Sequence, residues 1–364
     1  MPRSATRRSL LLGGAWLAAT AGAPALAARR KAKPAAPVAD DSAPNLVTYG
    51  ARDDVMQFAE AVAARRGLDV AWVRAALAQS RFVPSVVRYI MPPPVGTTKN
   101  WAAYRTRFVE PVRIQAGAAF WKANQSWLAT AEELYGVPPE IVVGIVGVET
   151  IYGRQMGNFR VVDALATLSF DFPPGRSDRS DFFKNELENW FVLCESEGVG
   201  PLAWKGSYAG AIGMAQFMPS SFNKYAVDLD GDGHVDLHHS AADVIGSVAN
   251  YLAEFGWKRG LPVRFEVEPP RDAELRAALL AADIVPTFSA ADFNEKGVLL
   301  PPAAEAVEGP LALIELENGD AAPSYVAGTG NFYTITRYNR SSYYAMAVTS
   351  LGEAVRRAAR GADA

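Results

Sequence analysis

The residue whose type and position most favour catalysis is Glu149. It follows residues 141–148, which are apolar on nearly every helical face and predict a buried helix that begins at Pro138-Pro139. Apolar surroundings and the negative end of the helix dipole both favour the neutral carboxyl, and no Lys or Arg follows before Arg154. A carboxylic acid that stays protonated near neutral pH is what a general acid needs to break a glycosidic bond. The alternative is a helix-end glutamate that simply faces solvent.

A second stretch, residues 208–221, is rich in small residues and surrounds Gln216. Glycine lets a backbone approach a ligand closely. The amide of Gln216 offers both a donor and an acceptor, as sugar hydroxyls and acetamides require. Taken alone, this pattern also fits a glycine-rich turn that leads into a helix capped near Ser220-Ser221.

A third stretch, residues 228–239, has the spacing of an EF-hand calcium loop. It places carboxylates at loop positions 1, 3, 5 and 9, a glycine at position 6 and a backbone carbonyl at position 7. Position 12, where a bidentate acid is expected, is His239, and imidazole is a poor ligand for a hard cation. The stretch therefore fits either a weak structural calcium site or a metal-free turn. The three histidines lack the helical spacing with a glutamate that zinc sites use. The predicted ligands are Asp228, Asp230, Asp232, His234 and Asp236.

Most of the chain that positions these residues has helical periodicity, and no internal repeat is present. The pattern predicts one long helix over residues 111–135, ended by Gly136. Strand-like alternation is confined to short runs after residue 260. These runs are 263–267, 313–316 and 332–335, and the other predicted helices cover about 55–62, 70–77, 161–168, 180–197, 241–255, 272–281 and 342–358. The fold class is therefore α+β and mainly helical.

The start of the chain has the features of an export signal. Arg3, Arg7 and Arg8 precede an apolar run over residues 10–21, and Ala25-Leu26-Ala27 offers a cleavage site. The run is too short and too rich in Gly and Ala for a good membrane span. The paired arginines fit a twin-arginine signal as well as an ordinary one.

Charge and cysteine content narrow the class of protein further. Loss of residues 1–27 removes three arginines and no acid, so the net charge falls from −3 to about −6, which argues against a nucleic-acid binder. The single Cys194 can form no intrachain disulfide, and it lies in an apolar run that predicts a buried thiol. No cysteine near the cleavage site can carry a lipid. We therefore expect an exported, periplasmic protein without a stable membrane anchor.

Several long motifs, in order, resemble the lytic murein transglycosylase B family. The resemblance covers nearly all of residues 50–358 and is far more specific than any one motif. It is carried by Glu149-Thr150-Ile151-Tyr152-Gly153, Asp163 to Phe170, Gly210-Ala211-Ile212-Gly213, Gln216 to Ser221, Ile245 to Tyr251 and Thr336-Arg337-Tyr338-Asn339. Where the family often has Trp, this chain has Tyr152.

The resemblance implies a lysozyme-like core with a flanking helical part and a small strand-containing insertion. The expected division is a signal peptide (1–27), a tether (28–48), a helical flanking part (49–110), a catalytic core (111–259) that contains the Asp-rich loop 228–239, a small α/β insertion (260–330), a return to the core (331–358) and a tail (359–364).

The resemblance also implies the site and its chemistry. Glu149 matches the catalytic acid, which would cleave the bond between N-acetylmuramic acid and N-acetylglucosamine with help from the substrate acetamide. It would then act as a base and leave a 1,6-anhydromuramoyl end, with no cofactor required. Tyr344 is expected to hydrogen-bond Glu149. The positions that match the sugar groove are Tyr104, Arg179, Ser207, Gln216, Phe217, Tyr251, Tyr338, Asn339 and Tyr344, with Arg179 placed beyond a loop at 173–178 that is longer than usual.

Two other functions stay open at this point. A lysozyme-like muramidase would use water and need a second carboxylate. Asp163 and Asp171 are the nearest candidates for it in the sequence. A non-catalytic peptidoglycan-binding or scaffold protein would have lost the acid, which is present here as Glu149. All three functions have peptidoglycan glycan strands as the partner.

Overall fold

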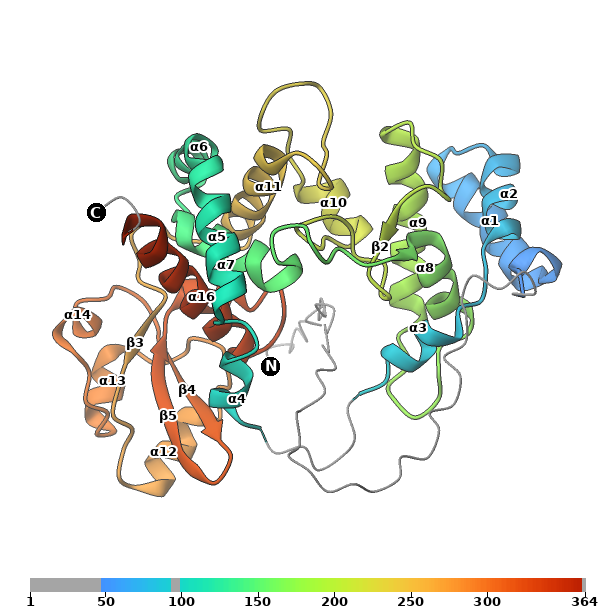
Figure 1. Ribbon diagram of the computed structural model, residues 1–364. Coiled ribbons are helices and arrows are strands. Elements are labelled where there is room, and N and C mark those ends of the chain that lie inside the picture. Colours follow the sequence, from blue (N-terminus) through green and yellow to red (C-terminus); the bar gives the residue numbers. More distant parts are fainter. Residues whose placement is uncertain (1–46, 93–98, 362–364) are drawn as a thin grey trace, which may run out of the picture.

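The computed structural model describes residues 47–92 and 99–361, and it is mainly helical with two small antiparallel sheets. The predicted α+β class is therefore confirmed. Two groups of helices lie apart in Figure 1. One contains α5 (Pro111–Ala123), α6 (Gln125–Tyr135), α7 (Pro139–Thr150) and α16 (Ser342–Gly361); the other contains α1 (Asp53–Arg66), α2 (Val70–Gln79), α8 (Val161–Phe170) and α9 (Ser180–Ser196).

Helix α7 is buried, as its apolar sequence predicts, and packs closely on α16. Gly144 and Gly352 make this approach possible. A Cβ at Gly144 would collide with the backbone oxygen of Val348, and one at Gly352 with that of Glu140. Helices approach most closely where both surfaces lack side chains, so these two glycines fix the position of α7 against α16.

The predicted single helix over residues 111–135 is wrong, because the chain breaks into α5 and α6 at Asn124. The Asn124 backbone leaves the helical region, with φ of −121°, and its side-chain Nδ2 donates to the carbonyl of Phe120 at 2.9 Å. Asparagine competes for backbone hydrogen bonds in this way and interrupts helices. The helical segment was predicted to end at Gly136, and this is confirmed, because Gly136 is the C-cap of α6 with φ of 72°.

Ion pairs join the first helices to α8 and α9. Near the short 3₁₀ turn η1 (Tyr49–Ala51), Asp171 accepts hydrogen bonds from the Tyr49 hydroxyl at 2.6 Å and from Arg52 Nη1 at 2.8 Å. On α9, Glu188 is held by two arginines at the end of α1. The helix α3 (Pro84–Tyr89) also packs on α8.

The strands form two separate sheets. The first pairs β1 (Phe159–Arg160) with β2 (Lys205–Gly206). The second has the order β3 (Arg264–Glu266), β5 (Ala321–Gly328), β4 (Ala312–Asn318), and α12 (Ala273–Leu280), α13 (Ala290–Glu295) and α14 (Pro302–Glu305) lie beside it (Figure 1). Strands at 263–267 and 313–316 were predicted; β5 was missed because its Ala, Pro and Ser residues show no alternation. This part has a hydrophobic cluster of its own, formed by Leu279, Phe293, Val298, Leu311, Leu313 and Ala327.

The predicted strand at 332–335 is wrong, because these residues form helix α15 (Gly330–Ile335). The hydroxyl oxygen of Thr329 accepts a hydrogen bond from the Asn331 amide and caps the helix. Phe332 and Ile335 then fall on one helical face, and both are fully buried. The β-branched and aromatic composition favoured a strand, but the cap and the burial of one face favour the helix.

Among the described residues, no helix is long and apolar enough to cross a membrane. The predicted signal peptide and almost all of the tether lie outside those residues. Cys194 is buried, as expected, and burial raises the pKa of its thiol.

Candidate active site

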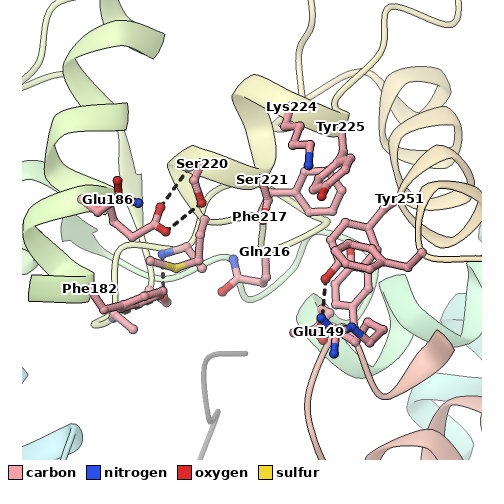
Figure 2. Close-up of a pocket in the computed structure, with 18 of the residues that line it drawn as sticks. Glu149, Phe182, Glu186, Gln216, Phe217, Ser220, Ser221, Lys224, Tyr225 and Tyr251 are labelled. Atoms are coloured by element: carbon pink, nitrogen blue, oxygen red, sulfur yellow. Dashed lines mark hydrogen bonds between the residues drawn. The ribbon is translucent and has the colours of Figure 1, made fainter. Parts of the chain in front are cut away.

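A pocket of about 240 Å³ lies where α7, α9, α10 (Pro219–Tyr225) and α11 (Ala241–Glu254) meet (Figure 2). Its walls come from segments more than 180 residues apart in the sequence. Of the ten residues predicted for catalysis and sugar binding, six line it: Glu149, Ser207, Gln216, Phe217, Tyr251 and Tyr338.

Glu149 lies in the last turn of α7 and is partly exposed in the pocket wall. Loss of contact with water raises the pKa of its carboxyl to about 7. The expected hydrogen bond is present: the Tyr344 hydroxyl, on α16, donates to Glu149 Oε1 at 2.5 Å and opposes the rise in pKa. A carboxyl with this pKa can both give and take a proton near neutral pH.

Tyr344→Phe is expected to shift the pH dependence of activity to higher pH. The variant loses the hydrogen bond that favours the charged form of Glu149, so the pKa of the acid rises further. Activity that needs protonated Glu149 falls as pH rises through this pKa, and in the variant the fall comes later. Measurement of kcat/KM between pH 5 and 9 tests this. Tyr343→Phe is the matched control, since the Tyr343 hydroxyl donates to the carbonyl of Glu317 instead. An unchanged pH profile in Tyr344→Phe would contradict the prediction.

The chain turns sharply after Glu149. Ile151 and Tyr152 both adopt the left-handed region, with φ of 52° and 56°, which is strained for such residues. Thr150 Oγ1 stabilises the turn by donating to the carbonyl of Met214 at 2.9 Å and accepting from the Gly153 amide at 3.0 Å. The end of the acid-bearing helix is thereby attached to the glycine-rich segment.

The glycine-rich segment places Gln216 in the pocket, beside its neighbour Phe217 (Figure 2). Gln216 is also left-handed, with φ of 51°, and its Nε2 donates to the carbonyls of Gly213 at 2.9 Å and Met156 at 3.2 Å. Gly213 has φ of 68°, and a Cβ there would collide with the backbone of Leu237. Strained backbone held by such contacts is typical of functional sites.

Three aromatic rings form one wall of the pocket. Tyr251 lies 4.8 Å from Tyr338 and 5.5 Å from Phe217, centroid to centroid. Backbone carbonyls fix the two tyrosine hydroxyls: Tyr338 donates to the carbonyl of Ala215 at 2.9 Å, and Tyr251 to that of Arg337 at 2.8 Å. Phe217 and Tyr251 are almost fully buried, whereas Tyr338 is partly exposed and offers a flat apolar surface suited to the face of a sugar ring.

The remaining predicted groove residues lie outside the lining of the pocket. Tyr104 lies on α4 (Trp101–Arg105). Burial raises the pKa of Tyr104 to about 12, and the nearby charge of Glu149 contributes to the rise. Arg179 stacks over Phe182, which does line the pocket, at 4.5 Å. Asn339 follows Tyr338, and its buried Oδ1 has no hydrogen-bond partner among the described residues.

Neither carboxylate named for a hydrolase lies in the pocket wall. Asp163 is bound by Arg160, at 2.7 Å from its Nε, and Asp171 by Tyr49 and Arg52. The pocket does contain a second carboxylate that sequence analysis missed, Glu186. Both of its oxygens accept hydrogen bonds from Ser220, from the amide at 2.9 Å and the hydroxyl at 2.7 Å (Figure 2). Ser220 lies near the start of α10, as expected, although the N-cap is Met218, and it also joins α10 to α9.

The Asp-rich loop brings together three of its five predicted ligands. Oxygens of Asp228, Asp230 and Asp232 lie within 4.8 Å of one another. Asp236 instead accepts hydrogen bonds from the backbone and ring of His239. A residue outside the motif, Asp243, lies close enough to feel the charges of the first two aspartates. Burial, together with these charges, raises the pKa of Asp243.

Comparison with known proteins agrees with this geometry. The family model described as the transglycosylase SLT domain matches residues 50–353. The membrane-bound lytic murein transglycosylase B of Escherichia coli (strain K12) is 40% identical over 310 residues, which is 83% of this chain and 82% of the relative.

Solved structures of two relatives are also similar. The E. coli lytic transglycosylase Slt35 is 38% identical over 86% of this chain and 97% of that one, with TM-scores of 0.77 for its complex with bulgecin A and 0.74 for its complex with calcium. SltB3 from Pseudomonas aeruginosa, in complex with NAG-anhNAM-pentapeptide, is 30% identical over 83% of this chain and 79% of that one, with a TM-score of 0.70.

The fold and the site therefore define an enzyme of the lytic transglycosylase class with a lysozyme-like fold. The chain belongs to the lytic murein transglycosylase B family.

Proposed function

We propose that this transglycosylase cleaves the β-1,4 bond between N-acetylmuramic acid and N-acetylglucosamine in peptidoglycan, with Glu149 as its acid and base. The observation that carries the proposal is the Glu149 carboxyl itself. It lies in a pocket lined by aromatic and amide side chains, and its pKa is raised to about 7. The resemblance of the motif around Glu149 to the family acid supports the same role.

The reaction uses this one carboxyl twice. Glu149 first protonates the bridging oxygen, so the N-acetylglucosamine side leaves as an alcohol. The acetamide oxygen of the muramic acid residue stabilises the positive charge at C1. Glu149, now ionised, removes the proton from the muramic 6-hydroxyl as that oxygen bonds to C1. The product is a 1,6-anhydromuramoyl end, and no water is consumed.

The surrounding side chains bind and orient the strand. Tyr338 is partly exposed and offers a ring face to a sugar, with the buried rings of Phe217 and Tyr251 packed beside it. Gln216 offers its amide oxygen to the polar groups of the sugar, since its Nε2 is engaged by backbone carbonyls. Tyr344 orients the acid through its hydrogen bond. Tyr104, Arg179, Ser207 and Asn339 are proposed to extend the groove.

Digestion of purified sacculi tests this function. The released muropeptides are expected to carry anhydro ends, which are lighter by one water than the reducing ends that a muramidase leaves. Products with reducing ends would favour hydrolysis, but Asp163 and Asp171 are already engaged by arginines. Binding without any release would favour the scaffold function.

We infer that the Asp-rich loop binds calcium, with Asp243 in the place of the acid missing at position 12. The donors are carboxylates, which suit this hard cation, and Asp243 lies near Asp228 and Asp230. The relative Slt35 has been solved in complex with calcium. The ion is proposed as structural, and the chemistry at Glu149 requires no cofactor.

Calcium is expected to raise the melting temperature of the protein. An ion that binds only the folded state stabilises it by about 1.4 kcal/mol when its concentration is roughly ten times Kd. For a loop of this kind we expect a Kd on the order of a millimolar. Thermal unfolding with and without calcium measures the effect, and Asp230→Asn is expected to abolish it. An equal effect of calcium on both proteins would refute the assignment of the loop.

We infer that the enzyme acts in the periplasm, where its substrate lies, after loss of residues 1–27. N-terminal sequencing of the exported protein is expected to find a start near Ala28, from the Ala25-Leu26-Ala27 motif. A protein that retains its first residues and sediments with membranes would contradict this.

The separate hydrophobic cluster within residues 279–327 supports the proposed insertion at 260–330.

A further inference from the structure

Two cationic side chains line the pocket without a carboxylate partner. Lys224 lies on α10 and Arg337 follows α15, and neither forms an ion pair within residues 47–92 and 99–361. Lys224 is exposed and Arg337 is half-buried. Elsewhere in the described residues several arginines are paired with acids, as Arg52 is with Asp171 and Arg160 with Asp163. Lys224 and Arg337 differ from these paired arginines.

Aromatic rings hold both cations in place. Lys224 Nζ lies 4.9 Å from the centre of the Tyr225 ring, and the Arg337 guanidinium lies 5.1 Å from that of Phe255. The Tyr225 and Phe255 rings are themselves 5.3 Å apart. The cations thus flank one pair of touching rings. A ring face attracts a cation without cancelling its charge, so both charges stay available to an anion.

The charge of the chain makes this arrangement informative. The whole sequence has a net charge of −3, yet two positive charges that form no ion pair within the described residues line the pocket that contains Glu149. The other pocket carboxylate, Glu186, is labelled on the opposite side of the pocket from Lys224 in Figure 2 and is bound to Ser220. The hydrogen bond to Tyr225 and, to a smaller extent, the charge of Glu254 raise the pKa of Lys224. Lys224 therefore stays protonated.

We propose that Lys224 and Arg337 form a carboxylate-binding site for the stem peptide carried by N-acetylmuramic acid. This inference rests on the proposed function, because it assumes a glycan strand in the pocket. The N-acetylated sugars of such a strand are neutral, and its carboxylates are on the peptides. Lys224 and Arg337 line the same pocket as Tyr251 and Tyr338. The two cations therefore select strands whose peptides carry free carboxylates.

A binding comparison tests the proposal. The Glu149→Gln variant is used as the binding protein, so that the probes are not cleaved. One probe is a disaccharide-peptide fragment with free carboxylates, and the other is the same fragment with those carboxylates converted to methylamides. We expect the free form to bind about 3–10 times more tightly, since a contact to a charged partner at a partly exposed site is worth roughly 1 kcal/mol. Lys224→Met in that background is expected to reduce this preference, and added Arg337→Met to remove it.

Lys258→Met is the matched control, because Lys258 is also exposed and lies outside the lining of the pocket. It should retain the full preference. The proposal is overturned if the parent binds both probes equally, or if Lys224→Met keeps the parent's ratio. Lys224 is a surface residue, so its variant carries the test even if Arg337→Met fails to fold. Release of anhydro ends from sacculi by the unmodified enzyme tests the proposed function separately.

Discussion

Glu149→Gln is expected to give a folded, strand-binding protein that releases anhydromuropeptides at least about 10²–10⁴ times more slowly. The substitution keeps the shape of the side chain and removes its transferable proton. The bridging oxygen would then leave unprotonated, and no base would remain for the 6-hydroxyl. Because one residue serves both steps, the loss should reach the upper end of this range or exceed it. Release rates from sacculi, measured by mass analysis, give the number.

The stability of this variant should depend on pH in a defined direction. The folded state raises the pKa of Glu149 from 4.5 to about 7, so between these values the folded protein holds a proton that the unfolded chain has lost. The stability contributed by Glu149 therefore falls as pH rises through that window. Glu149→Gln lacks this dependence and is expected to be at least as stable as the parent above pH 7. Thermal unfolding at pH 5 and pH 8 tests both statements.

Two controls make the result specific. Glu140→Gln changes the same residue type on the same helix, where Glu140 pairs with Arg356 at 2.6 Å outside the pocket, and should remain active. Glu186→Gln changes the other pocket carboxylate and should not abolish release, because both Glu186 oxygens are engaged by Ser220. Substantial release by Glu149→Gln would mean that another residue is the acid.

Gly144→Ala is expected to destabilise the protein by roughly 2–3 kcal/mol, despite the better helix propensity of alanine. The new methyl group would collide with the backbone oxygen of Val348 on α16. A backbone atom in a packed helix cannot rotate away, so α7 and α16 must separate. Their separation would also move Tyr344 away from Glu149, so activity should fall together with stability. Urea unfolding and release from sacculi measure the two effects.

Gly361→Ala is the matched control for this prediction. Gly361 is the last residue of α16, and a Cβ there would meet nothing within 4 Å. That variant should be neutral or slightly stabilised by helix propensity. If Gly144→Ala were as stable as Gly361→Ala, the close contact between α7 and α16 would not limit stability.

Local sequence predicted the elements whose pattern agrees with their final surroundings. Residues 141–148 are apolar throughout, and the helix they form is buried on all sides. Prediction failed where context decides. Asn124 breaks a pattern that is otherwise helical, and Thr329 turns a strand-like run into α15. Strand β5 is formed by pairing with β3 and β4, and its own residues carry little signal.

The site could be predicted only in part for a similar reason. Glu149 and Gln216 lie in distinctive motifs, but the walls between them come from α9, α10 and α11. Glu186 was missed, although a signal existed: it lies beside Phe183, Leu187 and Trp190 on the buried face of α9, where an acid is unusual. The left-handed backbone at Gln216 is fixed by contacts between distant segments, which no local pattern contains.

The packing of α7 on α16 has a consequence for the order in which a new chain can mature. Glu149 lies before the middle of the chain, but its partner Tyr344 and the surface around Gly352 belong to the last described helix. During synthesis the acid-bearing helix is made long before the helix against which it docks. Chains released early, before residue 342, lack that docking surface altogether. Any activity that needs Glu149 held by Tyr344 is thus confined to polypeptides that have been translated past α16.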